Sequence, residues 1–313
     1  MESIRRWPPA RRFLMAFVAT ALSSASAGGQ PAPMPSLDRG IDLYRKGQFD
    51  QAIGELTEVI RLEPSNALAY RFRGSAWFPK REYTRAVADY TEAIRLEPSN
   101  AAAYSCRAYA WFVQGQHRRA IADSSDAIRL KPNDADFYSN RGRAFSADGQ
   151  HDKAIADFTE SIRLDPKATK TYIFRGNSWL AKKEYDKAIA DFTEALRLEP
   201  RRAETYVSRG IARLSLLNKG DYDRALADFD EGIRLNAEHP LAYANRARAW
   251  LFKGEFDKAI TDCSHALRLD PECAAAYMSR GEAWAASGRH DKADADFRKA
   301  ELLLKRPLVP VLR

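Results

Sequence analysis

The sequence predicts an all-α protein, a solenoid of about eight stacked helix-turn-helix units. A motif of the form Arg-Leu-x-Pro recurs every 34 residues and ends at Pro64, Pro98, Pro132, Pro166 and Pro200. The next equivalent position is Ala237, 37 residues on, and Pro271 follows after a further 34. Such a period indicates units that bury their apolar faces only by stacking on their neighbours.

The N-terminal segment 1–27 differs from the rest and predicts a secretory signal peptide. Four arginines precede an apolar run from Phe13 to about Leu22, and small residues lead to Ala27. The run is roughly half of the ~20 residues that a membrane-spanning helix needs. We therefore expect cleavage after Ala27 and export, with a periplasmic location and no membrane span in the mature chain. An uncleaved segment that tethers the chain to the membrane is the alternative.

Charge and cysteine usage restrict the partners and the compartment chemistry. Removal of 1–27 deletes four arginines and one glutamate, which lowers the formal charge from +8 to +5. Because acids and bases alternate along the remaining chain, we expect no nucleic-acid partner. Cys106, Cys263 and Cys273 have no paired spacing and predict free thiols. Residues 28–36, GGQPAPMPS, predict a flexible linker.

Each unit contains two stretches with helical periodicity. Counted from the start of a unit, positions 4, 7, 8 and 11 share one face of a first helix, and positions 20, 24 and 27 share one face of a second. Position 8 is always Gly or Ala, and proline at position 32 ends the second helix. Position 4 is aromatic at Tyr70, Tyr104, Tyr138, Tyr172, Tyr206, Tyr243 and Tyr277. Position 20 is alanine at Ala52, Ala86, Ala120, Ala154, Ala188, Ala225, Ala259 and Ala293.

This pattern resembles the tetratricopeptide repeat family, and specifically its exported bacterial members. The resemblance covers 37–307, in units of about 33–66, 67–100, 101–134, 135–168, 169–202, 203–239, 240–273 and 274–307. A C-terminal tail, 308–313, follows. The resemblance implies a right-handed superhelix that holds other proteins through peptide segments and acts as a non-catalytic scaffold or adaptor, here in the cell envelope.

An arginine at position 7 departs from the family, which usually places an apolar residue there. It occurs at Arg39, Arg73, Arg107, Arg141, Arg175, Arg209, Arg246 and Arg280. An acid stands at position 23 in every unit: Glu55, Asp89, Asp123, Asp157, Asp191, Asp228, Asp262 and Asp296. Because a buried unpaired guanidinium would cost several kcal/mol, we predict a ladder of ion pairs, within or between repeats, with an architectural role.

The resemblance places a binding groove on positions 2, 5, 6, 9, 12 and 13 of the first helices. Aromatic side chains mixed with Asn and basic residues suit a peptide segment. The candidate groove residues are Arg71, Phe72, Tyr109, Phe112, Asn140, Arg143, Lys170, Phe174, Asn177, Asn245 and Arg248. Alternatively, some of these rings pack between adjacent first helices. The family's clamp for a C-terminal carboxylate is absent, because Ser105, Tyr109 and Phe174 occupy its positions.

No catalytic, cofactor or metal site is predicted. His117, His151 and His290 all stand at position 17, where other units carry an aromatic residue, so they replace a packing side chain. Other functions stay open: an accessory subunit of an envelope enzyme, or a carbohydrate- or peptidoglycan-binding module. Flat exposed groove aromatics would favour the last of these.

Two places depart from the regular unit. In the sixth unit Arg213 replaces the position-11 aromatic, Gly232 replaces an alanine, and SLLNKGDYD contains three extra residues. We expect a hinge or a partner-facing bulge there. The C-terminus lacks a polar capping helix, so the last apolar face is either covered by the tail or used for self-association.

Overall fold

A computed structural model describes residues 35–216 and 219–305 of the chain. The predicted signal peptide 1–27, the linker 28–36 apart from Pro35 and Ser36, and the tail 308–313 lie outside these residues. Within the described ranges the protein consists of helices and connecting turns, without a strand. The prediction of an all-α solenoid is therefore confirmed.

Sixteen α-helices and one short 3₁₀-helix make up the described chain. In order they are α2 (Leu37–Arg45), α3 (Phe49–Leu62), α4 (Ala67–Trp77), η2 (Phe78–Lys80), α5 (Tyr83–Leu96), α6 (Ala101–Val113), α7 (His117–Leu130), α8 (Ala135–Ala147), α9 (His151–Leu164), α10 (Thr169–Ala181), α11 (Tyr185–Leu198), α12 (Ala203–Ser215), α13 (Lys219–Leu235), α14 (Pro240–Phe252), α15 (Phe256–Leu269), α16 (Ala274–Ala286) and α17 (His290–Leu304). Each even-numbered helix is the first helix of a repeat, and the following odd-numbered helix is the second.

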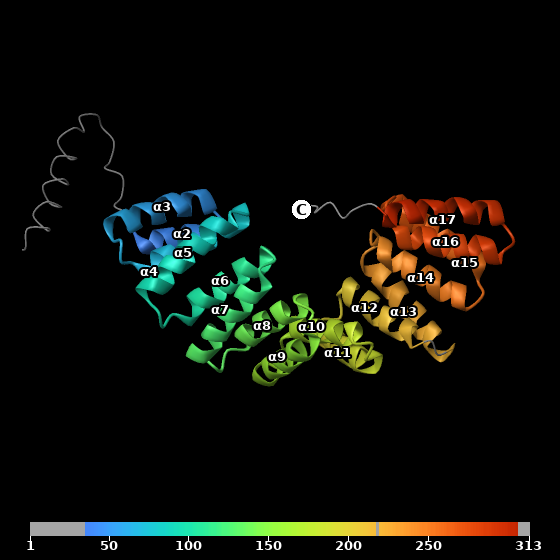
Figure 1. The fold of residues 1–313 in the computed structure, drawn as a ribbon, viewed down its shortest axis with the longest axis horizontal. Helices are drawn as coiled ribbons and strands as arrows, with labels where there is room; N and C mark the ends of the chain where they lie inside the picture. The colour runs from blue at the N-terminus through green and yellow to red at the C-terminus, as the bar shows by residue number, and fades with distance from the viewer. Residues whose placement is uncertain (1–34, 217–218, 306–313) are drawn as a thin grey trace, which may run out of the picture.

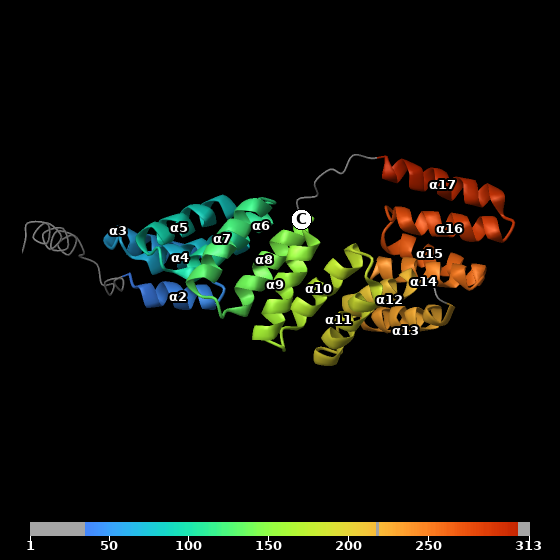
Figure 2. The ribbon, with the colours of Figure 1, turned by 60° about the horizontal axis from the view of Figure 1, so that its bottom comes forward.

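The helix pairs follow one another around an open arch (Figure 1). Helices α2–α5 form one limb, α14–α17 form the other, and the middle repeats join them. In the middle repeats the first helices α6, α8, α10 and α12 lie on the inner side of the arch, and the second helices lie outside. Successive pairs also change direction along the stack, as in a superhelix (Figure 2).

Position 8 is small because the side chain at position 24 packs directly on it. A methyl group on Gly142 would lie 2.7 Å from the Phe158 ring, and one on Gly176 would lie 2.8 Å from the Phe192 ring. Two repeats use the opposite combination. Where position 8 is Ala108 or Ala247, position 24 is the smaller Ser124 or Cys263. The two positions therefore share one fixed volume between them.

The predicted arginine ladder is present in the structure. From the second repeat onward, every position-7 guanidinium donates Nε and one Nη to the carboxylate at position 23 of its own repeat. In all these pairs except that of Arg209, the donor–acceptor distances are 2.7 to 2.9 Å. The carboxylates are buried, so paired guanidiniums keep these charges from being desolvated alone.

The remaining Nη connects each guanidinium to the preceding repeat, a link that the sequence analysis did not identify. It donates to a side-chain oxygen at position 25, 16 residues earlier, over 2.6 to 3.2 Å. These acceptors are Thr57, Thr91, Ser125, Thr159, Thr193, Asp230 and Ser264. Arg39 has no preceding repeat in the described chain and lies 3.9 Å from Glu55, which instead accepts the backbone N–H of Ser36 at 2.9 Å.

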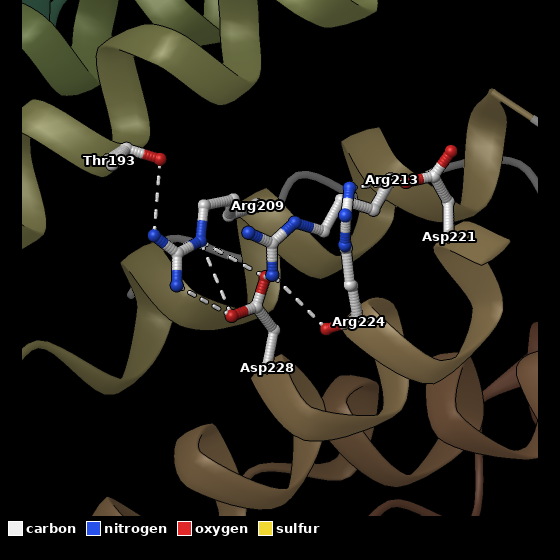
Figure 3. A network of polar contacts seen from close by, with 6 residues as sticks. All are labelled: Thr193, Arg209, Arg213, Asp221, Arg224 and Asp228. Atoms are coloured by element: carbon white, nitrogen blue, oxygen red, sulfur yellow. Dashed lines mark hydrogen bonds and ion pairs between the residues drawn. The ribbon is translucent and has the colours of Figure 1, made fainter.

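The sixth repeat modifies this ladder (Figure 3). Arg213 joins Arg209 on the Asp228 carboxylate, with its Nη1 at 2.7 Å from Oδ2, and the same Nη1 lies 3.2 Å from the Arg224 carbonyl oxygen. In other repeats a base at position 19 covers the position-11 ring, as Lys187 covers Trp179 at 4.6 Å. Here both positions carry guanidiniums, so two like charges replace a cation–π pair. Burial lowers the pKa of Arg213, and the Asp228 carboxylate opposes that shift.

The other departures of this repeat have local explanations. Gly232 leaves room for Val207, because a methyl group at Gly232 would lie 2.9 Å from the valine Cγ2 atom. The inserted segment contains residues 217–218, which lie outside the described residues. The hinge therefore stays a prediction.

Candidate functional site

The inner side of the arch carries a cleft of about 940 Å³ across the first helices of the third, fourth and fifth repeats. Side chains of α6, α8 and α10 line it, together with residues from the loops between repeats. Two smaller clefts, of about 440 and 290 Å³, adjoin it through shared residues. Arg143 lines all three clefts and so marks their centre. We call this combined surface the inner groove.

A row of aromatic rings forms one wall of the inner groove. Phe78 and Tyr109 are stacked with ring centroids 5.0 Å apart and an angle of 16° between their planes. The Phe112 ring continues the row, with its centroid 6.4 Å from that of Tyr109 and an angle of 13° between the two ring planes. Tyr109 and Phe112 stand three residues apart on α6 and therefore share a helix face. Tyr109 is 37% exposed, which means that this wall is open to a ligand.

The Arg143 guanidinium lies among three aromatic rings. Its carbon is 4.8 Å from the Phe112 centroid, 5.1 Å from that of Phe174 and 5.3 Å from that of Tyr109. Among the described residues it forms no ion pair and no hydrogen bond. The side chain is half-buried. It therefore differs from the ladder arginines, each of which has a carboxylate partner.

Amide and ammonium groups line the same clefts as Arg143. Asn140, one turn earlier on α8, donates to the Ser105 hydroxyl of the previous repeat at 3.4 Å, which leaves its carbonyl oxygen available. Asn177 is exposed on α10 and lines the smallest of the three clefts. Lys170 is exposed at the start of α10 and lines the largest. These side chains supply both donors and acceptors to a bound backbone.

Seven of the predicted site residues therefore come together: Tyr109, Phe112, Asn140, Arg143, Lys170, Phe174 and Asn177. The other four do not line the inner groove. Phe72 packs on the core between the first two repeats, and its ring meets that of Tyr44 edge-on at 5.9 Å. The Arg71 guanidinium lies 4.4 Å from the Phe72 centroid.

Of the two candidates on α14, one lines a separate cleft of about 430 Å³ and the other lines none of these clefts. Arg248 lines it together with Phe252 and Met278. Asn245 uses its amide to donate to the Leu241 carbonyl oxygen at 2.8 Å, within its own helix. Neither residue extends the inner groove of the middle repeats.

Several groove residues were absent from the predicted site. Phe78, at position 12 of the second repeat, contributes its ring from the short helix η2. Tyr90 reaches the groove from the second helix α5 and contacts the Ser75 hydroxyl at 3.2 Å; burial strongly raises its pKa. The loops add Lys131, Asp165 and Glu199. The position pattern could identify Phe78, but no periodic signal marks the loops.

The three cysteine thiols have a raised pKa, which is the opposite of what an activated nucleophile needs. Burial raises the pKa of the Cys106 thiol, against the opposing charge of Arg71. Burial also raises the pKa of Cys263 to about 12. Within residues 35–216 and 219–305, no group of three His, Cys, Asp or Glu side chains is placed to hold a metal ion. None of the helices in that part of the chain combines the length and the apolar character that crossing a bilayer requires.

Comparisons with known proteins agree with the repeat pattern. A sequence profile described as "Tetratricopeptide repeat" matches 37–101, 80–135, 107–169, 139–203, 214–270 and 253–303. No curated protein matches the chain.

Solved structures share the fold at low sequence identity. A repeat protein from Parabacteroides merdae is 20% identical, with a TM-score of 0.61 over 76% of this chain and 93% of its own. The C-terminal part of a repeat-containing protein from Cytophaga hutchinsonii is 19% identical, with a TM-score of 0.61 over 78% of this chain and 99% of its own. YrrB, described as having an unusual peptide-binding site, is 21% identical, with a TM-score of 0.50 over 60% of this chain and 95% of its own.

Proposed function

The chain belongs to the tetratricopeptide repeat family of interaction scaffolds, and we propose that it binds extended segments of other proteins in the inner groove, without catalysis of its own. The observation that carries this proposal is the open aromatic wall on η2 and α6 beside amide and basic groups on α8 and α10. Stacked rings supply apolar contact area, and the flanking amides can bind peptide backbone. YrrB gives a precedent for peptide binding on this fold.

Site-specific photo-cross-linking tests the proposed surface in the cells that make the protein. A benzophenone amino acid replaces Tyr109 in the inner groove or Arg118 on the outer helix α7, where the native side chain is also exposed. We expect protein adducts from the groove position and few from the outer one. Equal adducts from both positions, or adducts from Arg118 alone, would place binding on another surface.

A carbohydrate-binding module is the second candidate, and it is favoured by the nearly parallel rings of Phe78 and Tyr109. Flat exposed aromatics stack on sugar rings as well as on peptides. Calorimetric titration with a soluble peptidoglycan fragment separates the two proposals, because binding of the fragment and not of peptides would favour the sugar.

The proposal places the scaffold in the cell envelope, on the strength of the segment 1–27. The mature N-terminus, determined by sequencing the protein from fractionated cells, tests this location. A start near Gly28 in the periplasmic fraction is expected. An intact Met1 in the membrane fraction would indicate a tethered scaffold, and an intact Met1 in the cytosol would contradict export.

Self-association through the last repeat is a further part of the proposal. Leu302 and Leu304 on α17 are 65% and 69% exposed, which is unusual for large apolar side chains. If they form a contact between copies, Leu302→Lys with Leu304→Lys should lower the molar mass measured by light scattering. A monomeric mass for both the native protein and the double variant would exclude that contact.

A further inference from the structure

We propose that the inner groove selects segments that present an Asp or Glu carboxylate beside an apolar side chain, and that Arg143 anchors this carboxylate. The inference rests on the proposed function and narrows its ligand class. Its starting point is the difference between Arg143 and the ladder arginines of the same solenoid. The ladder guanidiniums each meet a carboxylate from their own repeat, whereas Arg143 meets only aromatic rings among the described residues.

The rings leave the donors of Arg143 unused. A guanidinium presents five N–H donors, and aromatic rings attract its charge without accepting hydrogen bonds of normal strength. Three centroids lie within 5.3 Å of its carbon, so the rings partly displace the water that would otherwise solvate it. A carboxylate matches the planar donor pair in a bidentate arrangement, which makes it the best-fitting partner for this group.

Three of the four acids that line the largest cleft already have partners. Asp134 pairs with Lys131 at 2.7 Å, and Glu199 pairs with Arg202 at 2.9 Å. Asp165 accepts the backbone N–H of Lys167 at 3.0 Å. Asp136 also lines the largest cleft without an ion pair among the described residues, and two lysines, Lys167 and Lys170, line the same cleft. The uncompensated charge nearest the centre is therefore positive.

The surroundings of Arg143 define what flanks the carboxylate. Tyr109 and Phe112 provide apolar surface on the α6 side, and Phe174 provides it on the α10 side. Asn140 lines the largest cleft and Asn177 the smallest, each together with Arg143, so their amides can bind the peptide backbone that flanks the carboxylate. An uncharged sugar would leave the guanidinium without a counter-ion, so the charge favours an acidic peptide over a neutral glycan.

A matched pair of peptides tests the inference on the unmodified full chain. The probes are N-acetylated, C-amidated Gly-Ser-Leu-Phe-Asp-Phe-Leu-Ser-Gly and the same peptide with Asn in place of Asp. Isothermal titration calorimetry measures both dissociation constants. Because a charge-assisted hydrogen bond contributes about twice as much as a neutral one, we expect the Asp peptide to bind about tenfold more tightly. That preference should shrink as the salt rises from about 0.1 M to about 1 M.

Variants assign the preference to Arg143. In Arg143→Gln the two peptides should bind with nearly equal affinity. Arg248→Gln is the matched control, because Arg248 occupies the same position 9 in a different first helix, is exposed, and has no aromatic ring against its guanidinium among the described residues. It should keep the full preference for Asp. Arg143→Lys keeps the charge but loses the planar donor pair, so an intermediate preference is expected.

The outcomes separate this inference from the proposed function. Equal binding of the two peptides to the native chain, with binding lost in Tyr109→Ala, would overturn the carboxylate anchor and leave the peptide-binding groove in place. A preference that survives in Arg143→Gln, or that disappears equally in Arg248→Gln, would also overturn it. Binding of a peptidoglycan fragment with no binding of either peptide would overturn both proposals. The peptide pair needs no variant, so a misfolded substitution cannot obscure the result.

Discussion

Removal of one guanidinium from the ladder should destabilise the solenoid far more than removal of an exposed one. Arg175 donates to Asp191 at 2.7 and 2.8 Å and to the Thr159 hydroxyl at 3.0 Å. The two charged side chains are 19% and 7% exposed. Arg175→Met keeps most of the apolar stem but leaves the carboxylate buried without its partner. Breaking a buried pair in this way costs about 3–5 kcal/mol.

The first repeat provides a matched control. Arg39 occupies the same position 7, is 48% exposed and lies 3.9 Å from Glu55. An exposed pair of this kind contributes about 0–1 kcal/mol, so Arg39→Met should change the free energy of unfolding little. Because Glu55 also accepts the Ser36 backbone N–H, it keeps a hydrogen-bond partner in this variant.

Urea unfolding followed by far-ultraviolet circular dichroism measures the difference. Arg175→Met should lower the midpoint clearly, and Arg175→Met combined with Asp191→Leu should recover most of the loss, because replacing both charges removes the unpaired one. Equal midpoints for Arg175→Met and Arg39→Met would refute the architectural role of the ladder. A double variant as unstable as Arg175→Met would instead show that the lost packing, and not the lone carboxylate, causes the effect.

Three further predictions concern packing, charge and thiol reactivity. Gly176→Ala places a methyl group 2.8 Å from a buried ring, so thermal unfolding should show a loss of about 1–3 kcal/mol in stability. The methyl group of Gly54→Ala meets nothing within 4 Å and should stabilise its helix by roughly 0.5–1 kcal/mol. Equal effects of the two substitutions would contradict the contact at Gly176. Arg163 lowers the pKa of Glu160, so Arg163→Gln should raise that pKa in a carboxyl NMR titration. The contribution of this ion pair to stability is present at neutral pH and is lost as the pH falls through the lowered pKa. An unchanged titration in the variant would mean that the pair does not persist in solution. Cys263 is fully buried with its pKa raised to about 12, so it should react with a disulfide reagent at mildly alkaline pH only after unfolding; rapid labelling of the native protein at this position would contradict the packing.

The architecture could be predicted from sequence because each of its rules is repeated along the chain. Alanine occurs at position 20 in all eight units, and each unit also has an arginine at position 7 and an acid at position 23. A pattern repeated eight times rarely arises by chance. The antiparallel helix pair then places positions 7 and 23 together, and the structure confirms this. The link to position 25 of the preceding repeat was missed because it depends on the spacing between units. A hydroxyl at a helical position is also a common neutral choice, so Thr159 carries no signal alone.

The candidate groove was predicted only in part, because the side chains that line it differ from one repeat to the next. Positions 9 and 12 place Tyr109, Phe112 and Arg143 on the groove face, and the structure has these three side chains in contact. Arg248 stands at the same position 9 but lines a separate cleft, because position numbers give the face of a helix and not which repeats share a cleft. Curvature of the stack and the loops between repeats decide that, and neither has a periodic signature.

Hydrogen–deuterium exchange of the full chain with and without the Asp-containing peptide tests the central claim most directly. If the inner groove is the binding surface, added protection should occur in segments of α6, α8 and α10 that surround Arg143. The outer helices α7, α9 and α11 should change less. Protection confined to the outer helices, or saturating peptide binding without any protection in α6, α8 and α10, would contradict the proposed function.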